Sequence, residues 1–459
     1  MATRTDAQPL RPYFRWLVLA IMSLICFAQY YIYDSITPLG TLIKSQLGFS
    51  GADYGLLFSF YAVANVFFFM LLLAGVLVDK LGLKVSGILY GFLCFLGAAL
   101  TALGAWKGLP GLLGPGYGWL HTAFFPQASP ELKIMLLGRM VYGVGAEAIL
   151  VVNNKVLARW FKGKELAFAY GMNLTIMRLG TFLALNLQAP IAEAWGLRAS
   201  LWFAAALMGA GFLTYFIYLG LERAARDRVG APGTTESGGV APEEKFVLKE
   251  AFSFDASFWF ITLLCVTFYS AVFPFQSYAP DILVQKFGYS VTAAGHYTSA
   301  LIFGTMIFTP ILGWFVDHRG KRATMMIFGA LLLIPSHLLL GYTHFPPVVP
   351  IFFVGIALSL VPAALWAAIP MMVPESRLGT AFGVVGYVQN VGLMLFPYLA
   401  GKIADAHTTV VNGEQVVDYT STMLMFVVLG VFGFVFSLLL KWADAHRKAG
   451  QSIESVMLH

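Results

Sequence analysis

Long apolar stretches alternate with short polar ones along the whole chain. A run of about 20 mostly apolar residues is long enough to cross a lipid bilayer as an α-helix. We predict twelve such helices and therefore an all-α membrane protein. Those of the first half span residues 14–38, 53–78, 84–106, 132–158, 165–188 and 197–220, and those of the second half span residues 256–280, 292–316, 322–343, 348–372, 378–401 and 422–442.

The longest polar stretch separates the sixth predicted helix from the seventh. It reads ERAARDRVGAPGTTESGGVAPEEKFVLKE, and its Gly, Pro, Ser and Thr residues with mixed charge are typical of a linker. We therefore predict an N-terminal six-helix bundle in residues 1–221, a cytoplasmic linker in 222–252 and a C-terminal six-helix bundle in 253–459. Near the end of the chain, TTVVNGEQVV predicts a short β-hairpin around Asn412 and Gly413.

Composition supports the membrane class, and charge predicts the orientation. Of the 459 residues, 59% are hydrophobic and 11% are charged, whereas soluble domains carry about 25% charged residues. Three of the 29 Lys and Arg residues lie deep in predicted helices, and 20 of the other 26 lie on cytoplasmic segments if the N-terminus is cytoplasmic. The positive-inside rule therefore predicts that both termini and the linker are cytoplasmic.

Two of the predicted cytoplasmic loops share one motif. The sequence GVLVDKLGLK begins at Gly75 and GWFVDHRGKR begins at Gly313, so two copies of G-x-x-x-D-x-x-G-x-[KR] start 238 residues apart. One basic turn is common in such loops, but two copies at equivalent positions of two halves argue against chance. We predict that the motif forms a conformational gate through Gly75, Asp79, Lys84, Gly313, Asp317 and Arg322.

This duplicated motif resembles the loop signature of the major facilitator superfamily. The resemblance covers the whole chain, because it includes the twelve helices and the central linker. It implies two bundles related by a pseudo-two-fold axis, with a substrate site between them near mid-membrane. It also implies alternating access by rocking of the two bundles.

Five charged residues lie inside predicted helices, where a charge costs about 2.5–3.5 kcal/mol at the bilayer centre. They are Asp34, Arg139, Glu147, Lys155 and Arg178. Buried charges are usually paired, so one interpretation is that Glu147 and Arg178 neutralise each other as an ion pair. The other is that they remain apart in a wet cavity and bind a ligand that carries both charges.

The remaining charged positions have several explanations. Arg139 would steady the fourth helix against its neighbours, and Lys155 is close enough to the cytoplasmic end to snorkel. Asp34 would line the outer vestibule, bind a cation or cap a helix break. We take Asp34 and His296 as candidates for proton coupling.

Aromatic and amide side chains of the second half complete the candidate site. Pro274 removes a backbone hydrogen bond from the seventh helix, and Tyr269 and Phe273 place aromatic surface around it. Gln389 and Asn390 put amides inside an apolar helix. The predicted substrate-binding residues are Glu147, Arg178, Asn154, Tyr269, Phe273, Trp366, Gln389, Asn390 and Tyr33.

Catalytic chemistry has no support in the sequence. We find no paired catalytic acids, no His/Cys metal spacing and no nucleophile motif. The three cysteines lie in apolar runs, as small buried residues do. We therefore predict a protein that is not an enzyme and has no cofactor, metal or nucleic-acid partner.

Several stretches are similar to the major facilitator superfamily domain-containing protein 1 group, the lysosomal dipeptide transporters. They are GRMVYGVGAEAI, WFKGKELAFAYG, MRLGT, AVFPF, ALW, VPESRLGTAFG and QNVGL. The resemblance implies transport of short peptides, with Glu147 on the peptide amino group and Arg178 on its carboxylate. Lys155 and the long 107–131 loop depart from the family pattern, and the loop leaves an accessory subunit open.

Two transporter functions are compatible with these residues. The first is a dipeptide carrier that works by uniport or proton-linked symport. The second is an organic-anion or monocarboxylate carrier, in which Arg178 binds carboxylate and Glu147 is a proton site. N-acetylation of the ligand distinguishes them, because only the first requires an amino group. We expect a monomer in the plasma (inner) membrane of a bacterium, or in the lysosomal membrane if the source is eukaryotic.

Overall fold

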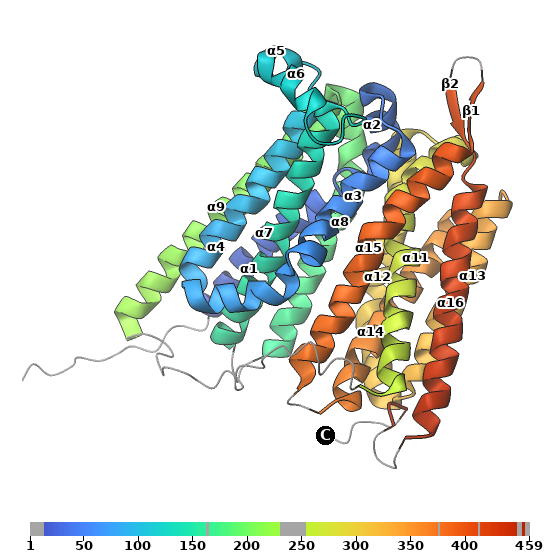
Figure 1. Cartoon of the computed structure of the whole chain (residues 1–459). Coiled ribbons are helices and arrows are strands. Elements are labelled where there is room, and N and C mark those ends of the chain that lie inside the picture. The colour runs from blue at the N-terminus through green and yellow to red at the C-terminus, as the bar shows by residue number, and fades with distance from the viewer. Residues whose placement is uncertain are drawn as a thin grey trace, which may run out of the picture.

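The computed structural model describes residues 13–161, 165–229, 254–374, 377–411, 414–447 and 452–454. Within these ranges, twelve helices of 17 residues or more run side by side (Figure 1). Those of the first half are α1 (Tyr13–Asp34), α3 (Gly51–Phe67), α4 (Met70–Gly104), α7 (Pro130–Phe161), α8 (Leu166–Trp195) and α9 (Leu197–Val229). Those of the second half are α11 (Ala256–Phe287), α12 (Val291–Arg319), α13 (Arg322–Tyr342), α14 (Val348–Met372), α15 (Leu378–Ala406) and α16 (Thr420–Ala445).

Ten segments of the described chain are long and apolar enough to cross a membrane by length and composition. The two other long helices are α3, with 17 residues, and α8, with 30. Helix α8 carries polar residues that face other helices, since Asn173 accepts a hydrogen bond from Ser23 of α1. The predicted all-helical membrane fold is confirmed. Residues 230–253, most of the predicted linker, lie outside the described residues.

All the short elements lie at one end of the molecule, at the top of Figure 1, which we call the hairpin end. They are the 3-10 helix η1 (Thr37–Leu39), the helices α2 (Gly40–Leu47), α5 (Leu109–Leu113) and α6 (Pro115–Thr122), and the strands β1 (Thr408–Val411) and β2 (Glu414–Val417). The two strands pair antiparallel, which confirms the predicted hairpin. Its turn at Asn412 and Gly413 lies outside the described residues. By the positive-inside prediction, the hairpin end faces away from the cytoplasm.

The two halves contact each other through few helices. Helix α3 packs against α15, and α8 packs against α12. Glycines make the first contact close: a Cβ at Gly55 would overlap the carbonyl oxygen of Pro397, and one at Gly401 would overlap that of Gly51. Small residues let helix backbones approach in this way in membranes, where burial of apolar surface does not drive association.

The second predicted helix is interrupted, which the hydrophobic pattern does not show. Helix α3 ends at Phe67, and Phe69 adopts a left-handed conformation with φ 51° before α4 begins. Phe69 stacks on Tyr387 of α15, with ring centroids 5.5 Å apart. Inside α4, Gly82 of the first loop motif has φ 75°, so the predicted turn between the second and third helices is present as a kink.

Arg139 fastens α7 to two other helices of the first half. Its side chain is 1% exposed, and its Nε donates to the carbonyl oxygen of Leu57 in α3 at 2.9 Å. Its two Nη atoms donate to the carbonyl oxygens of Ile32 and Tyr33 at 3.4 and 3.3 Å, at the C-terminal end of α1. A cation is favourable there, because the helix dipole is negative at its C-terminus. The structural interpretation of Arg139 therefore fits its contacts.

Replacing Arg139 by Leu is expected to destabilise the fold rather than change ligand preference. The substitution removes three hydrogen bonds that a charged group makes to backbone carbonyl oxygens, and each such bond is worth on the order of 1.5–3 kcal/mol. A thermal melt of the purified protein should show a clearly lowered midpoint for Arg139→Leu and an unchanged one for Arg223→Leu, which alters an exposed arginine on α9. Equal midpoints for the two variants would contradict this interpretation.

Candidate functional site

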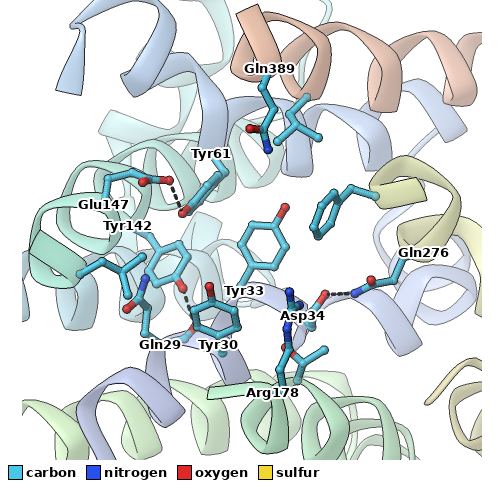
Figure 2. Close-up of a pocket in the computed structure, with 14 residues that line it drawn as sticks. Gln29, Tyr30, Tyr33, Asp34, Tyr61, Tyr142, Glu147, Arg178, Gln276 and Gln389 are labelled. Atoms are coloured by element: carbon cyan, nitrogen blue, oxygen red, sulfur yellow. Dashed lines mark hydrogen bonds between the residues drawn. The ribbon is translucent and has the colours of Figure 1, made fainter. Parts of the chain in front are cut away.

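A cavity of about 210 Å³ lies between the two halves, lined by α1, α3, α7 and α8 on one side and by α11 and α15 on the other (Figure 2). Three of its lining residues are charged: Asp34, Glu147 and Arg178. The other lining residues are Gln29, Tyr30, Tyr33, Tyr61, Tyr142, Leu150, Thr181, Phe273, Gln276, Gln389 and Leu393. The cavity therefore combines charged, amide and aromatic groups between two helix bundles.

Glu147 is half-buried in α7 and is held by two donors from α3. Tyr61 donates its hydroxyl to Glu147 Oε1 at 2.8 Å, and Asn65 donates its Nδ2 to the same atom at 3.2 Å. Asn65 also donates to Oδ1 of Asn390 in α15 at 3.0 Å. The acid that the sequence places in an apolar helix thus has hydrogen-bond donors but no cation among them.

Arg178 is half-buried in α8, and its guanidinium carbon lies 5.9 Å from the ring centre of Tyr30. In the part of the chain that the structure describes, no carboxylate forms an ion pair with it. Figure 2 shows Glu147 and Arg178 on separate walls of the cavity, with Tyr30 and Tyr33 between them. The two opposite charges are therefore held apart in one cavity and do not neutralise each other.

Asp34 lies at the C-terminal end of α1 and connects the two halves. It is buried, and Gln276 of α11 donates its Nε2 to Asp34 Oδ1 at 2.8 Å. Gln29 is held similarly, since its Nε2 donates to the carbonyl oxygen of Ala146 at 3.0 Å. These acceptors fix the orientation of both amides. Among the described residues, neither Oε1 receives a donor.

Aromatic side chains from both halves border the cavity. Tyr33 packs edge-to-face on Tyr61, with centroids 4.9 Å apart. Phe273 stacks on Tyr269 at 5.5 Å, and Trp366 donates its indole N–H to the Tyr269 hydroxyl at 2.9 Å. Helix α11 continues through Pro274, so the predicted aromatic surface is presented by an uninterrupted helix.

A second cavity of about 460 Å³ adjoins the first, because Arg178 lines both. It lies between α8 of the first half and α11, α12 and α14 of the second. Its wall is mostly apolar and includes Met172, Leu174, Met306 and Leu358. We call the two spaces the charged cavity and the apolar cavity.

The hairpin end of the molecule is closed by contacts between the halves. Asp281 of α11 is 1% exposed and accepts hydrogen bonds from Thr41 (2.6 Å), Lys44 and Tyr419, where Lys44 also forms an ion pair with it. Asp405 of α15 accepts from the backbone N–H groups of residues 51 and 52 at 2.6 and 2.8 Å, at the N-terminus of α3. Access to the charged cavity from this end is therefore blocked.

Four of the predicted substrate-binding and proton-coupling residues line neither cavity: Asn154, Trp366, Asn390 and His296. Trp366 and Asn390 contact other residues of the site through the hydrogen bonds given above. Asn154 is exposed, and its carbonyl oxygen accepts from the hydroxyl of Tyr170. His296 is exposed on α12, where its Nε2 lies 3.2 Å from the carbonyl oxygen of Asn186. Conversely, the sequence analysis did not select Gln29, Tyr61 or Gln276. The one sequence signal that could have suggested these three residues is a polar face on an otherwise apolar helix.

The two loop motifs are held in different ways. In the first, Asp79 forms an ion pair with Lys155 of α7, and Lys84 is exposed. In the second, Arg322 is buried and donates to the carbonyl oxygen of Ile453 at 3.5 Å. Glu454 caps α13 by accepting from the backbone N–H of residue 324 at 2.8 Å. The side chain of Asp317 lies outside what the structure describes.

Comparisons with known proteins agree with this architecture. The sequence profile of the Major Facilitator Superfamily matches residues 19–294 and 268–455. The human protein "Lysosomal dipeptide transporter MFSD1" is 29% identical over 410 residues, which cover 87% of this chain and 82% of that protein. Two solved structures have a similar fold. A bacterial homologue of the human lysosomal transporter Spinster has a TM-score of 0.69 and 17% identity, and the match covers 94% of this chain and 97% of that one. The nucleoside transporter NupG has a TM-score of 0.66 and 15% identity, and the match covers 94% of this chain and 100% of that one.

Proposed function

The chain belongs to the Major Facilitator Superfamily, a family of membrane transporters and not of enzymes, and from this premise we propose that it carries dipeptides by alternating access. One observation carries the proposal: Glu147 and Arg178 line the same cavity without pairing with each other. A dipeptide has an ammonium group at one end and a carboxylate at the other. It would neutralise both residues at once.

Each end of the dipeptide has a suitable partner in this arrangement. We assign the ammonium group to Glu147, because a carboxylate that already accepts from Tyr61 and Asn65 keeps a free oxygen, Oε2, for a further donor. We assign the carboxylate to Arg178, whose planar guanidinium can form two parallel hydrogen bonds with it. Affinity would then come from groups that all dipeptides share.

The amide side chains support a ligand that donates hydrogen bonds. The Oε1 atoms of Gln29 and Gln276 are buried acceptors without a donor in the described part of the chain. The amino group and the peptide N–H of a dipeptide would supply donors on this side of the cavity, whereas a simple monocarboxylate such as acetate has none. The relationship to MFSD1 supports the same substrate class.

Aromatic and amide groups would position the middle of the ligand. In this proposal Tyr33, Phe273 and Gln389, which line the charged cavity, contact the peptide directly. Tyr269, Trp366 and Asn390 support them through the contacts described above. The carrier would work by uniport, or by proton-linked symport with Asp34 as the proton site.

Thermal-shift measurements on purified protein test the substrate class. We expect Ala-Ala to raise the unfolding temperature, since a ligand at 100 times its Kd stabilises the folded state by about 2.7 kcal/mol. N-acetyl-Ala-Ala, free alanine and acetate should cause no shift at the same concentration, because each lacks one charge or the spacing between the two. Stabilisation by N-acetyl-Ala-Ala or by simple carboxylates would instead support the organic-anion carrier.

A further inference from the structure

The apolar cavity begins where the charged cavity ends, at Arg178. It is the larger of the two, at about 460 Å³ against about 210 Å³. Tyr269, Thr305 and Ser359, which line it on the side of the second half, are buried, whereas the wall formed by α8 is partly exposed. The function proposed above gives this space no role.

Polar groups on both sides of the apolar cavity already have partners. Thr309 donates its hydroxyl to Ser359 at 3.2 Å, and Thr175 donates to the carbonyl oxygen of residue 171 at 3.0 Å. No charged side chain other than Arg178 lines the cavity in the described part of the chain. A polar ligand group would therefore find few free partners here, and an apolar one would be favoured.

We propose that the apolar cavity receives the side chain of the C-terminal residue of the dipeptide and selects for large apolar groups at that position. The inference rests on the proposed function, because it requires the ligand carboxylate to lie on Arg178. The side chain of the C-terminal residue leaves the carbon atom next to that carboxylate. It is therefore the ligand group nearest to the space on the far side of Arg178.

The opposite end of the dipeptide meets a different surface. The charged cavity is the smaller of the two, and tyrosine and amide side chains line it together with Glu147 and Asp34. A large apolar side chain on the N-terminal residue would bury polar groups there without replacing their hydrogen bonds. Met172 and Met306 give the apolar cavity flexible, adaptable walls, so it accepts apolar side chains of different shape. The carrier is thus broad in which apolar side chain it accepts, but selective for its position.

Two dipeptides of identical composition and charge test the proposal. Gly-Phe and Phe-Gly are titrated against the full-length protein in detergent, and binding is measured by calorimetry with Gly-Gly as the reference. Gly-Phe should bind about tenfold more tightly than Phe-Gly, because only its ring enters the apolar cavity. Equal affinities for the two isomers would overturn the inference and leave the proposed function intact. If neither isomer binds, the proposed function itself fails.

A cavity-filling variant makes the test specific. Gly171 lines the apolar cavity, and a Cβ added there meets no other atom within 4 Å. Gly171→Phe should reduce Gly-Phe binding to the level of Gly-Gly and leave Phe-Gly binding unchanged. Gly220→Phe is the matched control, since Gly220 on α9 has equally open surroundings and lies in neither cavity. If the folded Gly171→Phe protein keeps its preference for Gly-Phe, the phenylalanine side chain of the ligand binds outside the apolar cavity and the inference is overturned.

Discussion

Replacing Glu147 by Gln is expected to weaken dipeptide binding by about 30-fold or more while the protein remains folded. Gln has the same shape as Glu and can still accept from Tyr61 and Asn65, so the local contacts persist. The ligand ammonium, however, loses its counter-charge in a half-buried site, and removing one partner of such a pair costs on the order of 2–5 kcal/mol. Calorimetric titration with Ala-Ala measures the loss.

The same variant has a second, more specific signature. Wild-type protein should distinguish Ala-Ala from N-acetyl-Ala-Ala, whereas Glu147→Gln should bind both with similarly low affinity. Glu131→Gln serves as the control, because Glu131 accepts a hydrogen bond from Tyr117 of α6 and lines neither cavity. Undiminished binding of Ala-Ala by Glu147→Gln would remove Glu147 from the binding site.

Adding a side chain at Gly55 is expected to hold the hairpin end open. In the closed structure a Cβ at this position would overlap the carbonyl oxygen of Pro397 and lie 2.6 Å from the Tyr278 hydroxyl. Because one of these obstacles is backbone, Gly55→Leu forces α3 and α15 apart. Transport of dipeptide into proteoliposomes should fall at least about tenfold, since one conformation of the cycle is no longer reached.

Thiol labelling reports the conformation of this variant. The native cysteines are buried, and Ser277 is buried near the contact between Tyr54 and α11, so a Ser277→Cys background introduces one reporter there. A membrane-impermeant maleimide should label it faster with Gly55→Leu than without. Gly220→Leu, in open surroundings, should change neither labelling nor transport. Slow labelling combined with lost transport would show that the contact is not part of a gate.

Most of the helices could be predicted from the sequence, because ten of the twelve long helices lie in segments that are long and apolar enough to cross a bilayer. The ends of the helices were harder to predict. The seventh predicted helix stops at residue 280, yet α11 continues to Phe287 and buries Asp281. The hydrophobic pattern shows only that Asp281 follows the end of an apolar run. It cannot show that Lys44 and Tyr419, far away in sequence, surround that carboxylate at the closed end.

Charged residues predicted the site better than uncharged polar residues did. Glu147 and Arg178 stand out because a charge inside a membrane helix needs a reason, and both line one cavity. Asn154 was selected because it lies seven residues from Glu147 on the same helical face. Seven residues advance a helix by about 10 Å along its axis, which carries Asn154 past the cavity. Gln29 and Gln276 were not selected, because an amide in a helix is informative only once its neighbours are known.

The charge balance of the charged cavity also decides how the electric field across the membrane acts on the carrier. A dipeptide with uncharged side chains brings one positive and one negative charge, so its passage by uniport moves no net charge and draws no energy from the field. A proton carried on Asp34 would add one elementary charge per cycle, which is worth about 2.3 kcal/mol for every 100 mV. The electric current recorded during dipeptide uptake therefore measures how many protons accompany each dipeptide.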